Sequence, residues 1–164
     1  MVGPWKKFQN QRKAWGGLVG RFVLAFGDIE NVTYLALSQL PRDSIFKSTS
    51  TLGFGKRVDL VIEIVRDHPE VSAFTRALFI RHLKEAKVLS DTRNTLAHSP
   101  LVLSLYRHPE WTHAELGIGT VRNSDKPVTL QVLRSKTREV EALAKKLHRA
   151  YSRVYKSVKR AKAA

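Results

Sequence analysis

The sequence predicts an all-α protein, a four-helix bundle in mostly up-and-down order, with a short β-hairpin inserted before the last helix. Apolar residues recur at intervals of three and four over four segments, as they do on the buried face of an amphipathic helix. Two short runs with a strand-like pattern follow Pro100. A chain of 164 residues is long enough for one domain with a real core, so we expect a single bundle.

The composition excludes several classes of protein. The chain has no cysteine, which rules out disulfides, thiolate catalysis and cysteine-ligated zinc. Its six histidines form no metal-ligand pair on one helix face, so we expect no metal and no other cofactor. Arg21, Asp28 and Glu30 interrupt the longest apolar region, and the N-terminus lacks the apolar run of a secretory signal. We therefore expect a cytoplasmic protein with no membrane partner.

The N-terminal residues 1–17 show no sustained period and contain two glycine breaks, so we expect a flexible basic and aromatic arm. The bundle domain then spans 18–155. Trp5, Phe8 and Trp15 alternate with lysines and arginines in this arm. Such aromatic side chains either stack on bases or pack against the parent protein or a partner subunit.

The first two bundle helices follow the arm. Helical spacing of apolar residues predicts a helix over 18–40, which Pro41 ends. A connector rich in serine and threonine covers 41–52, and a second helix is expected over 53–66. Glu30 lies beside the apolar stripe of the first helix, where a surface or partly buried carboxylate is the simplest interpretation.

The third helix is expected from about Ser72 to His98, because Pro100 disfavours a helical conformation at Ser99. Beyond Pro100, the segments 101–106 and 115–121 predict the two strands of a hairpin insertion over about 101–122.

The final helix is expected from about Thr129 and carries an apolar stripe opposite its basic residues, with 156–164 forming a basic C-terminal tail. The net charge is +15, and the segment from Arg134 onward holds eleven Lys or Arg against two acidic residues. Such a field attracts polyanions, and nucleic acid is the partner we expect. The alternative is a solvated helix face with a basic tail.

The end of the third helix carries the strongest candidate site. Asn94 and His98 are four residues apart and share a face, whereas Arg93 and His98 lie about 140° apart around an ideal helix. A guanidinium matches phosphate oxygens, an imidazole transfers protons, and an amide positions either group. These residue types together suit phosphodiester chemistry. The alternative is structural, with Arg93 and His98 capping carbonyls at the helix end.

The spacing alone does not select this site. Arg76 with His82, and Arg107 with His113, show similar spacing. What distinguishes the third pair is the polar Asn94 directly after the arginine and the helix end before Pro100.

The run Arg93-Asn94-Thr95-Leu96-Ala97-His98 resembles the R-x4-6-H motif of the HEPN superfamily, small helical proteins associated with nucleic acids. The stretches 26–30 and 52–57 also resemble the first two helices of that family, so the resemblance covers roughly 18–155. It implies a helical bundle and, as in many members, a metal-independent ribonuclease whose site forms where two copies meet. Other members of the family have lost activity.

The resemblance also implies roles for individual residues. In an endoribonuclease of this kind, His98 transfers the proton, Arg93 stabilises charge on the phosphate, and Asn94 positions either group. Glu30 would orient His98 or pair with Arg93. The implied partners are RNA, a second copy of the chain and, if the chain is a toxin or defence component, an inhibitory antitoxin. The alternative is a catalytically inactive, dimeric module for nucleic-acid binding or assembly.

Overall fold

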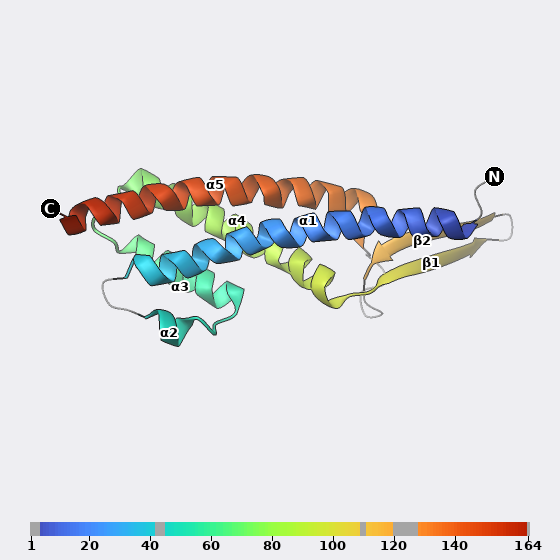
Figure 1. Cartoon of the computed structure of the whole chain (residues 1–164), viewed down its shortest axis with the longest axis horizontal. Helices are drawn as coiled ribbons and strands as arrows, with labels where there is room; N and C mark the ends of the chain where they lie inside the picture. The colour runs from blue at the N-terminus through green and yellow to red at the C-terminus, as the bar shows by residue number, and fades with distance from the viewer. Residues whose placement is uncertain (1–3, 42–44, 109–110, 120–127, 164) are drawn as a thin grey trace.

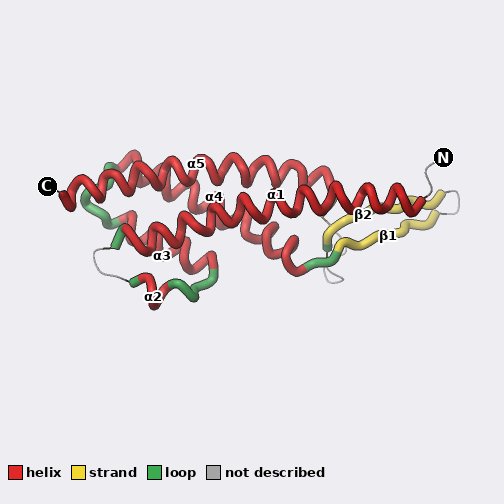
Figure 2. The backbone as a smooth tube through the Cα atoms, in the orientation of Figure 1, coloured by secondary structure: helices red, strands yellow, loops and turns green. Residues whose placement is uncertain are grey.

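The structure, a computed structural model, describes residues 4–41, 45–108, 111–119 and 128–163, with side chains over 11–41, 45–102, 116–119 and 128–161. The described chain is an elongated helical bundle with a small antiparallel sheet at one end (Figures 1 and 2). Its elements are α1 Pro4–Gln39, α2 Phe46–Thr49, α3 Phe54–Arg66, α4 Ala73–His98, β1 Leu101–His108, β2 Trp111–Ile118, β3 Val128–Thr129 and α5 Leu130–Ala163.

The two longest helices, α1 and α5, lie side by side and run in the same direction (Figure 1). Arg21 of α1 binds Glu141 of α5, and further along both helices the Tyr151 hydroxyl donates to Gln39 Oε1 at 2.6 Å. Contacts between residues of rising number on both helices are the sign of a parallel pair.

Helix α3 also runs parallel to α1. The Phe26 and Phe54 rings meet edge to face with centroids 5.0 Å apart, and one turn further along α3 the Arg57 Nε donates to Thr33 Oγ1 at 3.2 Å. This arrangement corrects the predicted up-and-down order, in which consecutive helices alternate. The segment between α1 and α3, which includes the single turn α2, carries the chain back along α1 before α3 begins (Figure 2). Only α4 runs against the other long helices (Figure 1).

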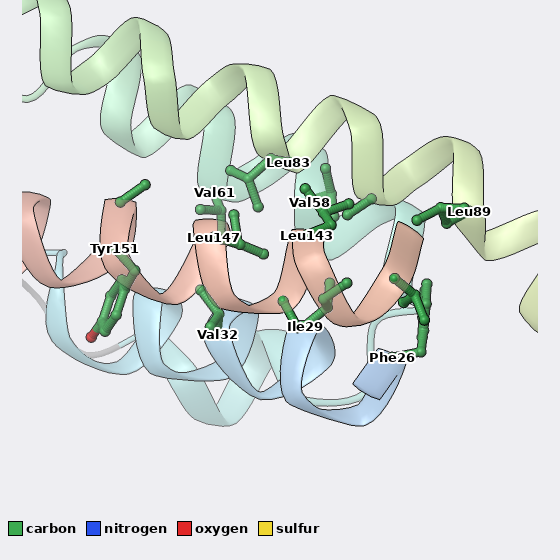
Figure 3. Packing of buried hydrophobic residues seen from close by; sticks show 14 of the residues in the cluster. Phe26, Ile29, Val32, Val58, Val61, Leu83, Leu89, Leu143, Leu147 and Tyr151 are labelled. Atoms are coloured by element: carbon green, nitrogen blue, oxygen red, sulfur yellow. The ribbon is translucent and has the colours of Figure 1, made fainter. Parts of the chain in front are cut away.

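The core lies where the four long helices meet (Figure 3). Each helix contributes fully or nearly fully buried side chains at helical spacing, and burying one such side chain stabilises the fold by about 1.5–3 kcal/mol. The labelled members are Phe26, Ile29 and Val32 from α1, Val58 and Val61 from α3, Leu83 and Leu89 from α4, and Leu143, Leu147 and Tyr151 from α5.

Helix α1 begins at Pro4, which corrects the prediction of a flexible arm before Leu18. The indole of Trp15 is only 3% exposed and belongs to the core, so the packing role considered for this residue is the one observed. Gly16 and Gly17 lie inside the helix, where each costs about 1 kcal/mol relative to alanine. Burial of Trp15 outweighs that cost.

Helix α4 has the bounds that the sequence predicted. The Ser72 hydroxyl accepts from the Thr75 backbone N–H at 3.3 Å and caps the first turn. At the other end, Ser99 has extended backbone angles of φ −117° and ψ 137°, so the helix ends at His98.

The hairpin after Pro100 is confirmed, with strands that differ from the predicted ones. β1 and β2 pair antiparallel from Leu101 opposite Ile118 to His108 opposite Trp111. The β3 strand, which the sequence did not predict, pairs with the end of β2. Side chains over 103–115, and the whole of residues 109–110 and 120–127, lie outside the described residues.

Helix α5 continues to Ala163, so residues 156–163 of the predicted C-terminal tail over 156–164 are helical. Val158 is 2% exposed and packs in the core, which explains why the helix does not end near Tyr155. Of the helices described, none combines the length and apolar character required to cross a bilayer.

Candidate functional site

A pocket of about 440 Å³ opens between α1, the start of α3 and the C-terminal half of α4. Its walls combine aromatic rings with charged and amide side chains, and two glycines flank the first residue of α3. The lining residues are Phe26, Glu30, Tyr34, Gly53, Phe54, Gly55, Arg57, Ser90, Arg93 and Asn94.

Arg57 is the buried cation of this pocket, with 5% of the residue exposed. Its Nε donates to Thr33 Oγ1 at 3.2 Å and its Nη1 to the Leu52 carbonyl at 2.6 Å. The guanidinium also lies 4.1 Å from the centre of the Tyr34 ring. A face of an aromatic ring attracts a cation, so these contacts fix the Arg57 side chain in one orientation.

Glu30 on α1 faces two guanidinium groups. Its Oε1 lies 3.8 Å from Arg57 Nη2 and 3.8 Å from Arg93 Nη2. Both separations exceed a normal charge-assisted hydrogen bond of about 2.7–2.9 Å. One carboxylate is therefore shared between two cations, and the side chains at this point carry a net positive charge.

Arg93 lies half-buried at the edge of the pocket, and its Nη1 donates to Asn94 Oδ1 at 3.2 Å. Glu30, Arg93 and Asn94, three of the four residues singled out from the sequence, therefore lie together. Of the two roles considered for Glu30, the pairing with Arg93 is the one present, at 3.8 Å.

His98 stands apart from this group. It is the last residue of α4, its side chain is exposed, and it is not among the described residues that line the pocket. Arg93 turns toward α1 while His98 faces solvent, as their separation of about 140° on an ideal helix requires. Within one copy of the chain, Arg93 and His98 point in different directions.

Sequence reasoning missed Arg57, although a signal was present. Arg57 follows Phe54 by three residues and precedes Val61 by four, so it falls on the apolar face of its helix. A charged residue on that face is buried only with partners that satisfy it. The partners come from α1 and from the segment before α3, which the sequence does not place.

A second charged region runs along α5. Its exposed members recur at intervals of four and seven residues, which places them within about 80° of the helix circumference and over about 39 Å. We call it the basic stripe. Its residues are Arg134, Arg138, Lys145, Arg149, Lys156 and Arg160.

The basic stripe borders α1. The Arg21 guanidinium binds both oxygens of Glu141 at 2.8 and 2.9 Å and so ties the two helices together. A groove of about 720 Å³ next to this bridge is lined by Asp28, Asn31, Glu141, Lys145 and Arg149 among others. With Glu141 paired to Arg21, Lys145 and Arg149 outnumber Asp28, the other carboxylate in the lining of this groove.

Comparisons of the chain with protein-family models, curated proteins and solved structures give no significant match. Within the part of the chain that the structure describes, no three His, Asp or Glu side chains gather as metal ligands would.

Proposed function

We propose that the chain is a HEPN-like endoribonuclease that cleaves RNA without a metal ion. The observation that supports it is the arrangement at the end of α4. There a guanidinium is held at the edge of a polar pocket, and an exposed imidazole follows on the last turn of the same helix. Attack of an RNA 2′-hydroxyl on the adjacent phosphodiester needs a cation near the phosphate and a group that transfers protons. An anchored Arg93 and an accessible His98 are groups of these two kinds.

The proposed reaction begins when the 2′-hydroxyl attacks the adjacent phosphorus and its proton passes to a base. The new 2′-oxygen–phosphorus bond forms as the 5′-oxygen–phosphorus bond breaks, and the departing 5′-oxygen takes up a proton. The imidazole of His98 performs one of these transfers. Arg93 stabilises the negative charge that grows on the phosphate oxygens, and Asn94 positions the guanidinium. The products are a 2′,3′-cyclic phosphate and a 5′-hydroxyl.

The directions of Arg93 and His98 favour a site built from two copies. In one copy the guanidinium turns toward α1, while the imidazole faces solvent. A single phosphate meets both groups most easily when Arg93 comes from one copy and His98 from another. We therefore propose a homodimer, with the two α4 ends meeting at the RNA.

The basic stripe of α5 supplies the grip on RNA in this proposal. Lys and Arg side chains that contact phosphates release counterions from the nucleic acid, and this effect gives affinity without sequence preference. The proposal places the enzyme in the cytoplasm with its RNA. If it acts as a toxin or in defence, an antitoxin would be its inhibitory partner.

A specific observation favours a second candidate, a catalytically inactive dimer that binds nucleic acid. Glu30 and Asn94 hold Arg93 within the chain, while no hydrogen bond among the described residues orients His98. An Arg93 that stabilises the pocket would leave RNA binding to α5 alone. Turnover distinguishes the enzyme from the binding module.

The deciding experiment incubates purified protein with end-labelled single-stranded RNA in the presence of EDTA. We expect fragments that end in a cyclic phosphate from the unchanged protein and none from His98→Ala, because the proton transfer is lost. Lys84→Ala changes an exposed residue of the same helix, away from the pocket and the basic stripe, and should cleave normally. Absence of cleavage by the unchanged protein, with RNA still bound, would favour the binding module.

A mixing experiment tests whether two copies build the site. Arg93→Gln and His98→Ala should each be inactive alone, and mixing them should restore part of the cleavage because mixed dimers contain one intact site. An inactive mixture that nevertheless exchanges subunits would contradict the shared site.

A further inference from the structure

We propose that the pocket between α1, α3 and α4 is a binding site for a phosphate group, and that it accepts a phosphorylated nucleoside. This site does not depend on RNA cleavage, because it would bind its ligand equally in an inactive protein. It shares Arg93 with the proposed catalytic edge and adds Arg57, which no part of the cleavage mechanism uses.

The first support is unsatisfied charge. Arg57 Nη2 and Arg93 Nη2 each lie 3.8 Å from the same Glu30 oxygen, and neither nitrogen makes a hydrogen bond within the described residues. A buried guanidinium normally binds a carboxylate or phosphate through two parallel hydrogen bonds. Two guanidinium groups that share one carboxylate at this distance each keep an Nη2 that can still donate hydrogen bonds to another anion in the pocket.

The second support is rigidity. Arg57 is 95% removed from solvent, and its Nε, its Nη1 and its ring-facing side are all occupied by protein groups. Its remaining nitrogen, Nη2, therefore points in a fixed direction. A donor that is already oriented loses little conformational entropy when a ligand binds.

The third support is the shape and lining of the pocket. A volume of about 440 Å³ falls within the range of small-molecule sites, so it holds more than a bare phosphate ion. The rings of Phe26, Tyr34 and Phe54 lie in its wall, where a ribose or a base can pack against them. Gly53, the N-cap of α3, also lines the pocket. It provides no side-chain cap, so backbone N–H groups in the first turn of α3 lack a side-chain acceptor there, and such donors favour an anion.

Glu30 is the competitor of the incoming phosphate. Its carboxylate now faces both arginines, so a bound anion must work against the negative charge of Glu30. Replacement of Glu30 by glutamine should therefore strengthen phosphate binding, whereas loss of either arginine should weaken it. Opposite effects from neighbouring residues distinguish a defined site from general attraction to a protein of charge +15.

The test is isothermal titration calorimetry with AMP, adenosine and inorganic phosphate at constant ionic strength. We expect AMP and phosphate to bind and adenosine not to bind. Arg93→Gln should weaken AMP binding about tenfold, the effect of losing one charge-assisted hydrogen bond. Glu30→Gln should tighten it severalfold. These two residues are partly exposed, so their variants remain informative even if an Arg57 variant fails to fold.

Matched variants control for net charge. Arg81→Gln lies on α4 with its side chain 65% exposed, and Glu63→Gln is exposed on α3, and both should bind AMP as the unchanged protein does. Equal AMP affinity in all four variants would overturn the site, and so would equal binding of adenosine and AMP.

The source of the phosphate group is tested with a short 5′-phosphorylated oligoribonucleotide. The comparison is with the same oligonucleotide ending in a 5′-hydroxyl, which meets the basic stripe equally. Tighter binding of the phosphorylated form that Arg93→Gln abolishes assigns the pocket to an RNA end, and equal binding of the two forms, with AMP still bound, assigns it to a free nucleotide. Both results support the phosphate site. Retained binding in His98→Ala, whether or not RNA is cleaved, separates this site from the proposed function.

Discussion

Arg93 and Arg57 line the same pocket, yet only Arg93 can be recognised as a site residue from the sequence. Arg93 belongs to a local run that ends at Pro100, so its neighbours in the chain are enough to single it out together with Asn94 and His98. Arg57 is held in the pocket by a hydrogen bond to Thr33, which lies on another helix. The contribution of such a residue depends on tertiary contacts.

At the residue scale, Arg93→Lys tests the proposed transition-state role. An ammonium is a point charge and cannot hold two phosphate oxygens in a plane, so we expect RNA cleavage to fall by roughly a hundredfold or more. The measurement is the initial rate of cleavage of labelled RNA. Arg81→Lys makes the same change elsewhere on α4 and should leave the rate intact; a normal rate in Arg93→Lys would argue against the role.

Tyr151 links stability to alkaline pH. Burial, with a smaller contribution from Tyr155, raises the pKa of Tyr151 to about 12 from the model-peptide value of 10.0. The fold therefore favours the neutral phenol. The contribution of the neutral Tyr151 phenol to the free energy of unfolding is fully present below about pH 10. This contribution, roughly 2–3 kcal/mol, is lost as pH rises toward about 12.

Tyr151→Phe checks this linkage, because phenylalanine has no phenol to ionise. We expect the free energy of unfolding, measured in urea from about pH 9 to about pH 12, to decline less steeply in the variant. The variant also loses the hydrogen bond to Gln39, which lowers its free energy of unfolding by an amount that does not change with pH below about pH 9. Parallel declines in the two proteins would show that another group controls the alkaline transition.

At the element scale, α4 and α1 show what local signals determine. Both ends of α4 follow from side chains next to them, the Ser72 cap and Pro100, so the sequence predicts them correctly. The start of α1 does not follow from local signals, since Gly16 and Gly17 favour a break. The helix continues through these glycines because Trp15 is buried in the core, and that burial depends on the neighbouring helices.

Trp15→Ala tests the role of this residue in holding the first turns of α1. Removal of a buried indole should lower the free energy of unfolding by about 3–4 kcal/mol. The measurement is the urea midpoint at constant slope. Gln11→Ala changes an exposed residue of the same segment and should have little effect. If the two variants are equally stable, Trp15 does not anchor the helix.

At the scale of the whole molecule, the sequence predicted a mostly helical chain with a hairpin, but not the order of its helices. The period of apolar residues identifies helices, whereas their directions depend on the connections between them. The long segment from Leu40 to Gly53 gave no signal of its return along α1, so α3 was expected to run antiparallel. The parallel pair of α1 and α5 follows from that connection.

At this scale the basic stripe should control how RNA affinity depends on salt. The His98→Ala protein, which should bind RNA without cleaving it, is the one to measure. Replacing Lys145 and Arg149 by glutamine should lower the slope of log affinity against log salt by about 1.4, because each lost phosphate contact contributes about 0.7 on single strands. Arg81→Gln with Lys84→Gln removes equal charge from α4 and should leave the slope unchanged. An unchanged slope in the first pair would remove this part of α5 from the RNA interface.

The parallel pairing of α1 and α5 also has a consequence for synthesis on the ribosome. Arg21 and Glu141 are 120 residues apart in the chain, so the helix made first finds its partner only when the last one has emerged. Until then the part of the apolar face of α1 that packs against α5 is exposed to solvent and to other nascent chains. A ribosome stalled before α5 would therefore hold a chain prone to aggregation, and chaperones would be needed during that interval.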